Sequence, residues 1–170
     1  KKKTVIVAPG ANWIGKVWPA KRYCTMLKKL SKVRKFSDTL FVVVGPEEEK
    51  EIMNDLLNDS SLDILNLVGK LSLVEIFLIM KNAKLFIGND SGLMHLAALS
   101  NVPTVGIFGP SDPKKYSPWG KETFVIKSPK TPDELMGYKG FNSKKVDSLM
   151  LDLSVKFVYE KILSFYKKLK

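Results

Sequence analysis

The segment Asn89-Asp90-Ser91-Gly92 gathers side chains and backbone groups that can bind an anion. It follows the apolar run 85–87, which has no helical spacing and reads as a strand covered on both faces, and it precedes the apolar stretch 93–99. The polar residues tolerate unusual backbone angles and cap helices, so we expect a helix over 91–100. The first N–H groups of such a helix bind phosphate at the carboxyl end of an open α/β sheet. The pattern predicts a site for a phosphate-bearing ligand.

A simpler interpretation stays open, in which Asp90 or Ser91 is an ordinary N-cap. His95, the single histidine of the chain, lies one turn after Ser91 on the same helical face. Such a residue is either a hydrogen-bonded packing residue or a contact to the ligand. Metal binding is not expected, because the chain has no second histidine and one cysteine, Cys24.

A second candidate for phosphate binding is the loop from Gly10 to Lys16. Its glycines have the GxxxxGK spacing of a P-loop, but Val17 stands where the magnesium-binding Ser or Thr would be. The chain contains no GxGxxG and no Asp-x-Asp pair. The charge of a phosphate is therefore expected to be neutralised by the protein's own cations and helix termini, without a metal or cofactor.

Strands and helices alternate along the chain, which predicts an α/β fold with a doubly wound parallel sheet. Strands are expected at 4–8, 39–44, 64–67, 85–87, 103–107 and 123–126. Helices are expected from Pro19 to about 33, starting at 47–49, at 72–83, at 91–100 and from 154 to about 169. The segment 109–120 is expected to be a loop rich in proline and glycine, and 127–148 is a polar region with little periodicity. The strand-to-helix loops of such a sheet share one edge, so 10–16, 45–49, 68–72, 89–92 and 109–119 should line one crevice. Trp119 is expected to cap this crevice or cover the base of its loop.

Composition restricts the partners. The 170 residues suffice for one domain, and 28 Lys and Arg against 17 Asp and Glu give a net charge of +11, which favours anionic partners. The lysines are scattered and no basic stripe with interleaved aromatics occurs, so nucleic acid is not an expected partner. The sequence has neither a long apolar run nor a recognisable signal peptide, and its one cysteine fits the cytoplasm.

Three motifs in the same order resemble the carboxyl-terminal, donor-binding half of glycosyltransferase family nine, the ADP-heptose:lipopolysaccharide heptosyltransferases. They are Pro9-Gly10-Ala11 with Lys16 and Trp18-Pro19, then the block 89–98 (NDSGLMHLAA), then 103–113 (PTVGIFGPSDP). The resemblance covers nearly the whole chain. It implies a Rossmann-like domain, the second half of a two-domain GT-B enzyme, over residues 1–170.

The resemblance also implies roles for individual residues. Lys16, Asp90 and His95 would stabilise the donor and the leaving nucleotide as catalytic residues. The implied donor contacts are Gly10, Ala11, Asn12, Lys16, Glu49 at the ribose, Leu71 at the adenine, Asp90, Ser91, Gly92, Leu93 and His95. Two departures stand out: Ala11 and Asn12 occupy positions where relatives often carry hydroxyls, and Val17 replaces a frequent basic residue.

By the same resemblance, the whole enzyme would transfer heptose from ADP-heptose to the lipopolysaccharide inner core by an inverting, metal-independent mechanism. Its partners would be the nucleotide-sugar donor, the lipopolysaccharide core acceptor, its own amino-terminal domain and the anionic inner face of the inner membrane. The amino-terminal acceptor domain, which carries the general base, is expected to lie outside this chain, so the chain alone should bind donor but not transfer sugar. Three alternatives remain: a non-catalytic sugar-nucleotide-binding module, a transferase of another sugar, and a sugar-nucleotide epimerase.

Overall fold

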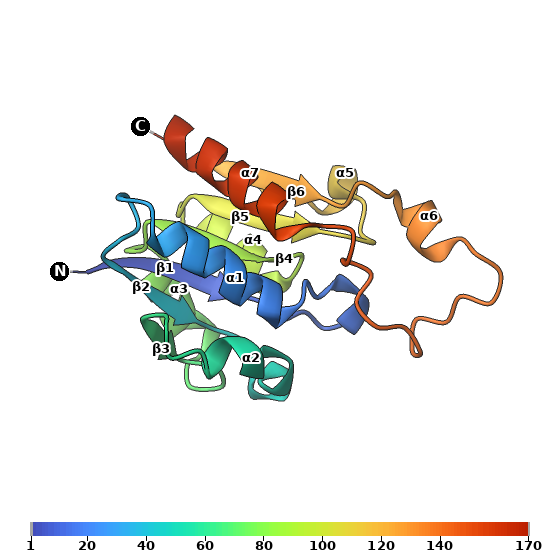
Figure 1. The fold of residues 1–170 in the computed structure, drawn as a ribbon, viewed down its shortest axis with the longest axis horizontal. Helices are drawn as coiled ribbons and strands as arrows, with labels where there is room; N and C mark the ends of the chain where they lie inside the picture. Colours follow the sequence, from blue (N-terminus) through green and yellow to red (C-terminus); the bar gives the residue numbers. More distant parts are fainter. Residues whose placement is uncertain (1, 170) are drawn as a thin grey trace.

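A six-stranded parallel sheet forms the centre of the molecule (Figure 1), as seen in a computed structural model that describes residues 2–169. The strand order is β3-β2-β1-β4-β5-β6. The strands are β1 (Lys3–Ala8), β2 (Thr39–Val43), β3 (Ile64–Asn66), β4 (Leu85–Asn89), β5 (Thr104–Phe108) and β6 (Thr123–Lys127). The order reverses between β1 and β4, which are neighbours, and ligands bind at this switch point in folds of this kind. The predicted doubly wound sheet is confirmed.

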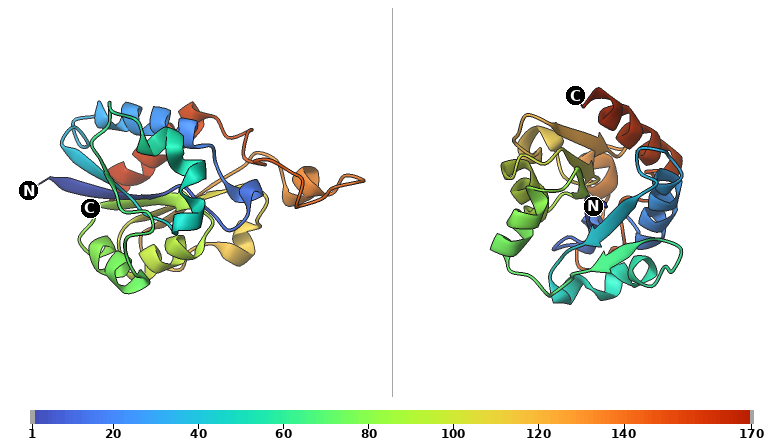
Figure 2. Two further views of the ribbon diagram at one scale, coloured as in Figure 1. Left: turned by 90° about the horizontal axis from the view of Figure 1, so that it is seen from below. Right: turned by 90° about the vertical axis from the view of Figure 1, so that its left-hand side faces the viewer.

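Helices cover both faces of the sheet (Figure 2). Helices α1 (Ala20–Ser31), α2 (Asn54–Leu57) and α7 (Val155–Lys168) lie on one face, and α3 (Leu73–Met80) and α4 (Gly92–Leu99) lie on the other. Successive residues of a strand therefore enter different cores. In β4, Leu85 and Ile87 belong to the core beneath α1 and α7, whereas Phe86 belongs to the core beneath α3 and α4. Burial of both faces explains why the strands read as continuous apolar runs.

The expected loop 109–120 and the polar region 127–148, for which no helix is expected, each contain a short helix. Helix α5 (Pro113–Tyr116) starts at Asp112, whose side chain accepts a hydrogen bond from the Lys114 N–H. Helix α6 (Pro132–Met136) starts with a capping box, in which Thr131 and Glu134 each accept from the other's backbone N–H. Conversely, the helix expected to start at residues 47–49 begins as two 3-10 turns, η2 (Glu47–Glu49) and η3 (Glu51–Met53), before α2.

The segment from α6 to residue 153 extends past the carboxyl ends of the strands (Figure 1) and then returns along the first loop of the chain. The Trp13 indole N–H donates to the Ser143 carbonyl at 2.7 Å, and the Leu149 N–H donates to the Gly15 carbonyl at 3.1 Å. That loop contains the short helix η1 (Ile14–Lys16). The carboxyl-terminal segment thus buttresses the loop that carries Lys16. Within residues 2–169, no helix has the length and apolar character needed to cross a membrane.

Candidate functional site

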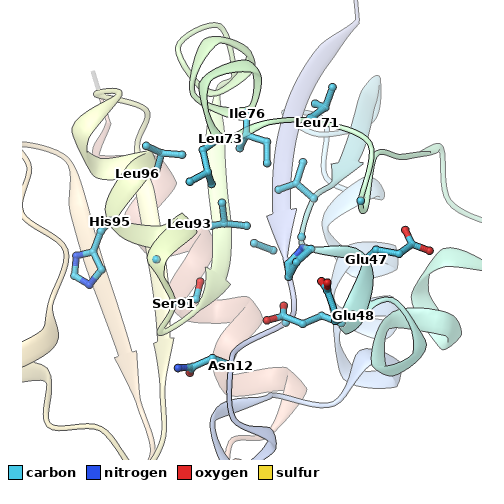
Figure 3. A pocket seen from close by; sticks show the side chains of 18 of the residues that line it. Asn12, Glu47, Glu48, Leu71, Leu73, Ile76, Ser91, Leu93, His95 and Leu96 are labelled. Carbon is cyan, nitrogen blue, oxygen red and sulfur yellow. The ribbon is translucent and has the colours of Figure 1, made fainter.

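A cavity of about 950 Å³ opens at the carboxyl end of the sheet, where the switch point lies. The loops after β1, β2, β3 and β4 form its walls, as expected of the strand-to-helix loops. The contribution of the 109–119 loop is smaller, because Tyr116 alone of that loop lines the cavity. Figure 3 shows polar side chains at one end, among them Asn12 and Ser91, and apolar side chains at the other, among them Leu71 and Ile76.

Lys16 and Asp90 form an ion pair at the polar end. Lys16 Nζ lies 2.8 Å from Asp90 Oδ2, and the side chains are 26% and 7% exposed. Among the described residues 2–169 this oxygen has no partner for an aligned hydrogen bond, so the contact is a charge pair and the oxygen can still accept a hydrogen bond. The ammonium is also 5.9 Å from the centre of the Tyr116 ring. A lysine with three donors that is partly open to the cavity can bind an anionic ligand while it keeps its carboxylate neighbour.

The start of α4 faces the same end of the cavity. Ser91 occupies the N-cap position, but its buried hydroxyl makes no capping hydrogen bond and has no hydrogen-bond partner in the part of the chain that the structure describes. The interpretation of this hydroxyl as a simple N-cap is therefore wrong. A Cβ added at Gly92 would meet no atom of residues 2–169 within 4 Å, so the backbone at the first turn of α4 is open on that side, and the first N–H groups of a helix have no partner within the helix. A free hydroxyl beside a free helix start is an arrangement that binds phosphate oxygens.

Carboxylates from the loop after β2 form a third wall. Glu47, Glu48 and Glu49 all line the cavity. Glu49 is packed against Gly10, where an added Cβ would collide with its carboxylate. Burial, and secondly the charge of Glu48, raise the pKa of the Glu49 carboxyl above its usual value. Glu47 is instead paired with Lys50 at 2.7 Å. These groups can accept hydrogen bonds from ligand hydroxyls.

The far end of the cavity is apolar. Leu71 precedes α3 and Leu73 begins it, and both lie opposite Leu93 and Leu96 of α4 (Figure 3). Leu73 is an exposed leucine, 66% accessible, at the edge of this wall. Gly69, with φ of 70°, provides the turn that brings this loop against Glu47. Apolar walls of this kind accept the flat face of a base.

The sequence-predicted site residues are brought together with one exception. Those that line the cavity are Gly10, Asn12, Lys16, Glu49, Leu71, Asp90, Ser91, Gly92, Leu93 and His95. Ala11 is buried and does not line it. His95 is exposed on α4 and projects away from the carboxylate wall (Figure 3). Trp119 is 90% exposed and does not line the cavity, so the expectation that it caps the crevice is wrong. Trp18 is fully buried in the core.

Sequence reasoning missed several lining residues. Tyr116 arrives from a short helix inside a segment expected to be irregular, and Leu73, Ile76 and Leu96 come from helix faces that periodicity assigns to core packing. The signals available were the Asp112-Pro113 helix start and the apolar character of 73–80, which leaves Leu73 and Leu78 exposed.

The strand order and the cavity at the switch point define the class of the chain as a Rossmann-like α/β domain. The sequence model of glycosyltransferase family 9 (heptosyltransferase) matches residues 1–139, and the chain belongs to this family. It is 31% identical over 125 residues to lipooligosaccharide heptosyltransferase 2 of Campylobacter jejuni, covering 71% of this chain and 38% of that protein. It is 31% identical over 124 residues to lipopolysaccharide heptosyltransferase 2 of Escherichia coli, covering 70% of this chain and 34% of that protein.

Solved structures agree on the fold. The ADP-heptose lipopolysaccharide heptosyltransferase II of E. coli superposes with a TM-score of 0.76 at 24% identity, covering 98% of this chain and 47% of that one. The E. coli heptosyltransferase WaaC, solved with ADP, gives a TM-score of 0.74 at 20% identity and covers 96% of this chain and 44% of that one. The chain thus spans less than half of the length of these relatives.

Proposed function

We propose that this chain binds the donor nucleotide sugar of a heptosyltransferase, which transfers heptose from ADP-heptose to the lipopolysaccharide inner core. The observation that carries the proposal is the polar end of the cavity, where the Lys16 ammonium, the Ser91 hydroxyl and the start of α4 converge. A diphosphate there would receive the hydrogen bonds that these groups do not make within the protein. Relatives named as heptosyltransferases and a neighbour solved with ADP support the choice of ligand.

The remaining walls suit the other parts of the donor. The ribose hydroxyls would donate to the carboxylate of Glu49, and the adenine would lie against Leu71 and its apolar neighbours. Asp90 Oδ2, buried and without an aligned hydrogen bond, would accept from a hydroxyl of the donor sugar. His95, on the exposed side of α4, would stand near the sugar end. The cavity volume of about 950 Å³ is large enough for a sugar nucleotide.

The chemistry follows from this placement. An acceptor hydroxyl attacks the anomeric carbon of the heptose from the face opposite the phosphate, and the bond between that carbon and the phosphate oxygen breaks, which inverts the configuration. The departing ADP gains negative charge on the oxygen it keeps. Lys16 and the N–H groups of α4 would stabilise that charge, and each such contact contributes a few kcal/mol in a dry site. The proton of the acceptor hydroxyl would go to a general base on an amino-terminal domain outside this chain.

The proposed mechanism needs no metal ion, since Lys16 and the helix start would supply the positive potential at the diphosphate. Among residues 2–169, no three His, Cys, Asp or Glu side chains are placed to hold a metal. The net charge of +11 suits a phosphorylated acceptor and contact with the anionic inner face of the inner membrane.

Calorimetric titration of the 170-residue chain with ADP, UDP and GDP, each with and without EDTA, tests the proposal. We expect ADP to bind at least tenfold more tightly than UDP or GDP, with no change on adding EDTA. Preference for UDP, or loss of binding in EDTA, would overturn it. A parallel assay with ADP-heptose and acceptor is expected to show no transfer by the chain alone.

A further inference from the structure

Asn89, the last residue of β4, is fully buried and hydrogen-bonded to both ends of the Lys16 loop. Its amide nitrogen donates to the Pro9 carbonyl at 2.6 Å. Its amide oxygen accepts from the Tyr23 hydroxyl at 2.9 Å and, at a longer 3.4 Å, from the Trp18 backbone N–H. Pro9 and Trp18 flank the loop that carries Lys16, so one side chain connects the two ends of that loop.

The position of Asn89 in the strand favours an apolar residue. It lies on the same face as Leu85 and Ile87, which pack in the core beneath α1 and α7. An amide in such a core is unfavourable unless it is hydrogen-bonded. Burial raises the pKa of Tyr23 well above its usual value, which keeps its hydroxyl protonated as the donor to Asn89. A polar group at a core position, with its partners supplied, marks a functional constraint.

The next residue along the chain holds the same loop by a second contact. Asp90 forms an ion pair with Lys16 at the cavity. Asn89 donates a hydrogen bond to the Pro9 carbonyl from the face of the sheet that α1 and α7 cover. Two consecutive residues therefore fix the Lys16 loop relative to the start of α4, which carries the other phosphate-binding groups. The distance between these two sets of donors decides whether both can reach one diphosphate.

We propose that Asn89 is a positioning residue for the diphosphate, which sets the Lys16 loop at the spacing that the ligand requires. This inference rests on the proposed function. Asn89 acts through the backbone of the loop, since its own side chain does not line the cavity.

The variant Asn89→Leu keeps the branching of the side chain at Cγ, with methyl groups in place of the amide oxygen and nitrogen, and removes all three hydrogen bonds. We expect amide hydrogen exchange in the peptide 10–18 to accelerate at least tenfold relative to the strands, and ADP affinity to fall at least tenfold by calorimetry. The matched control is Ile162→Ala, which leaves a cavity in the core beneath α7 at a fully buried residue that does not line the site. The control is expected to lower stability, while loop exchange relative to the strands and ADP affinity stay within twofold of wild type.

A more conservative variant, Tyr23→Phe, removes only the hydrogen bond from the Tyr23 hydroxyl to Asn89, with little change in side-chain volume. It tests the role of Asn89 if Asn89→Leu does not fold. It is expected to accelerate loop exchange and weaken ADP binding about threefold. Folded Asn89→Leu with wild-type loop exchange and ADP affinity would overturn the inference, and so would an unchanged Tyr23→Phe when Asn89→Leu is unfolded. Failure of the wild-type chain to bind ADP would instead overturn the proposed function, while the exchange data would still report on the loop.

Discussion

The two ends of the sheet each hold a partly buried lysine, and their environments differ in kind. At the carboxyl end, Lys16 faces Asp90 at 2.8 Å beside an open cavity. At the amino end, Lys84 donates to the Thr39 hydroxyl at 2.6 Å and the Lys35 carbonyl at 3.1 Å, and it lies 4.3 Å from the centre of the Phe36 ring. No carboxylate within residues 2–169 is at ion-pair distance from Lys84.

This difference separates a charged group that is available to a ligand from one whose hydrogen bonds are used within the fold. Lys16 has a carboxylate that balances its charge and donors that stay free toward the cavity. Lys84 has its donors occupied by neutral groups, and burial, followed by the nearby charge of Lys3, lowers its pKa to about 8. An anion therefore gains from Lys16 without displacing a structural contact, whereas Lys84 makes the folded state less favourable while it is charged.

The largest expected effect is on ADP binding by Lys16→Met. Loss of a charge-assisted contact to phosphate is expected to cost about 3 kcal/mol, which corresponds to roughly a hundredfold weaker binding by calorimetry. The matched control Lys84→Met removes the same charge from the opposite end of the sheet and is expected to leave ADP affinity within twofold. Equal losses in the two variants would mean that net charge alone attracts the nucleotide.

Next in size is the effect of Gly92→Ala at the start of α4. An added Cβ meets no protein atom within 4 Å, and alanine is a better helix former than glycine, so the free energy of unfolding is expected to change by less than about 0.5 kcal/mol. A diphosphate seated on the helix start would lose contact with the backbone, and ADP affinity is expected to fall about tenfold. Wild-type affinity would show that the phosphates do not approach this backbone.

A smaller effect is expected for Lys84, in the dependence of the free energy of unfolding on pH. Below pH 8 the amine is protonated in both states, and between about 8 and 10.5 the folded state releases its proton while the unfolded state keeps it. Stability contributed by this group therefore rises with pH across that window. Because the side chain is only partly buried, screening by water limits the gain to roughly 1 kcal/mol. Denaturant melts from pH 7 to 10 are expected to lose this rise in Lys84→Met, and an identical slope in the variant would refute the lowered pKa.

The sequence predicted the sheet well because each strand is an apolar run ended by Pro, Gly or polar residues. Pro9-Gly10 closes β1, and Gly45-Pro46 follows β2. The candidate site followed from the same logic, since strand-to-helix loops of a parallel sheet meet at one edge. The hydrogen bonds of Asn89 were not predictable from the sequence. Asn89 belongs to a polar run that reads as a turn, whereas in the structure it ends β4 with its side chain in the core. The contacts of residues 143–153 with the first loop join segments about 130 residues apart, and no local pattern encodes them.

The smallest expected effect distinguishes Glu49 from Glu47 as the ribose contact. Glu49→Gln is expected to abolish a severalfold preference for ADP over 2′,3′-dideoxy-ADP, because an amide accepts hydrogen bonds from hydroxyls less strongly than a carboxylate. The raised pKa of Glu49 means that its contribution to stability falls as pH rises from about 4.5 through its folded-state value, and this decline is expected to disappear in Glu49→Gln. Glu47→Gln, which breaks the pair with Lys50, is the matched control and is expected to keep the preference for ADP. Loss of the preference in Glu47→Gln with retention in Glu49→Gln would assign the ribose to Glu47 and leave the burial of Glu49 against Gly10 a packing feature of the loop.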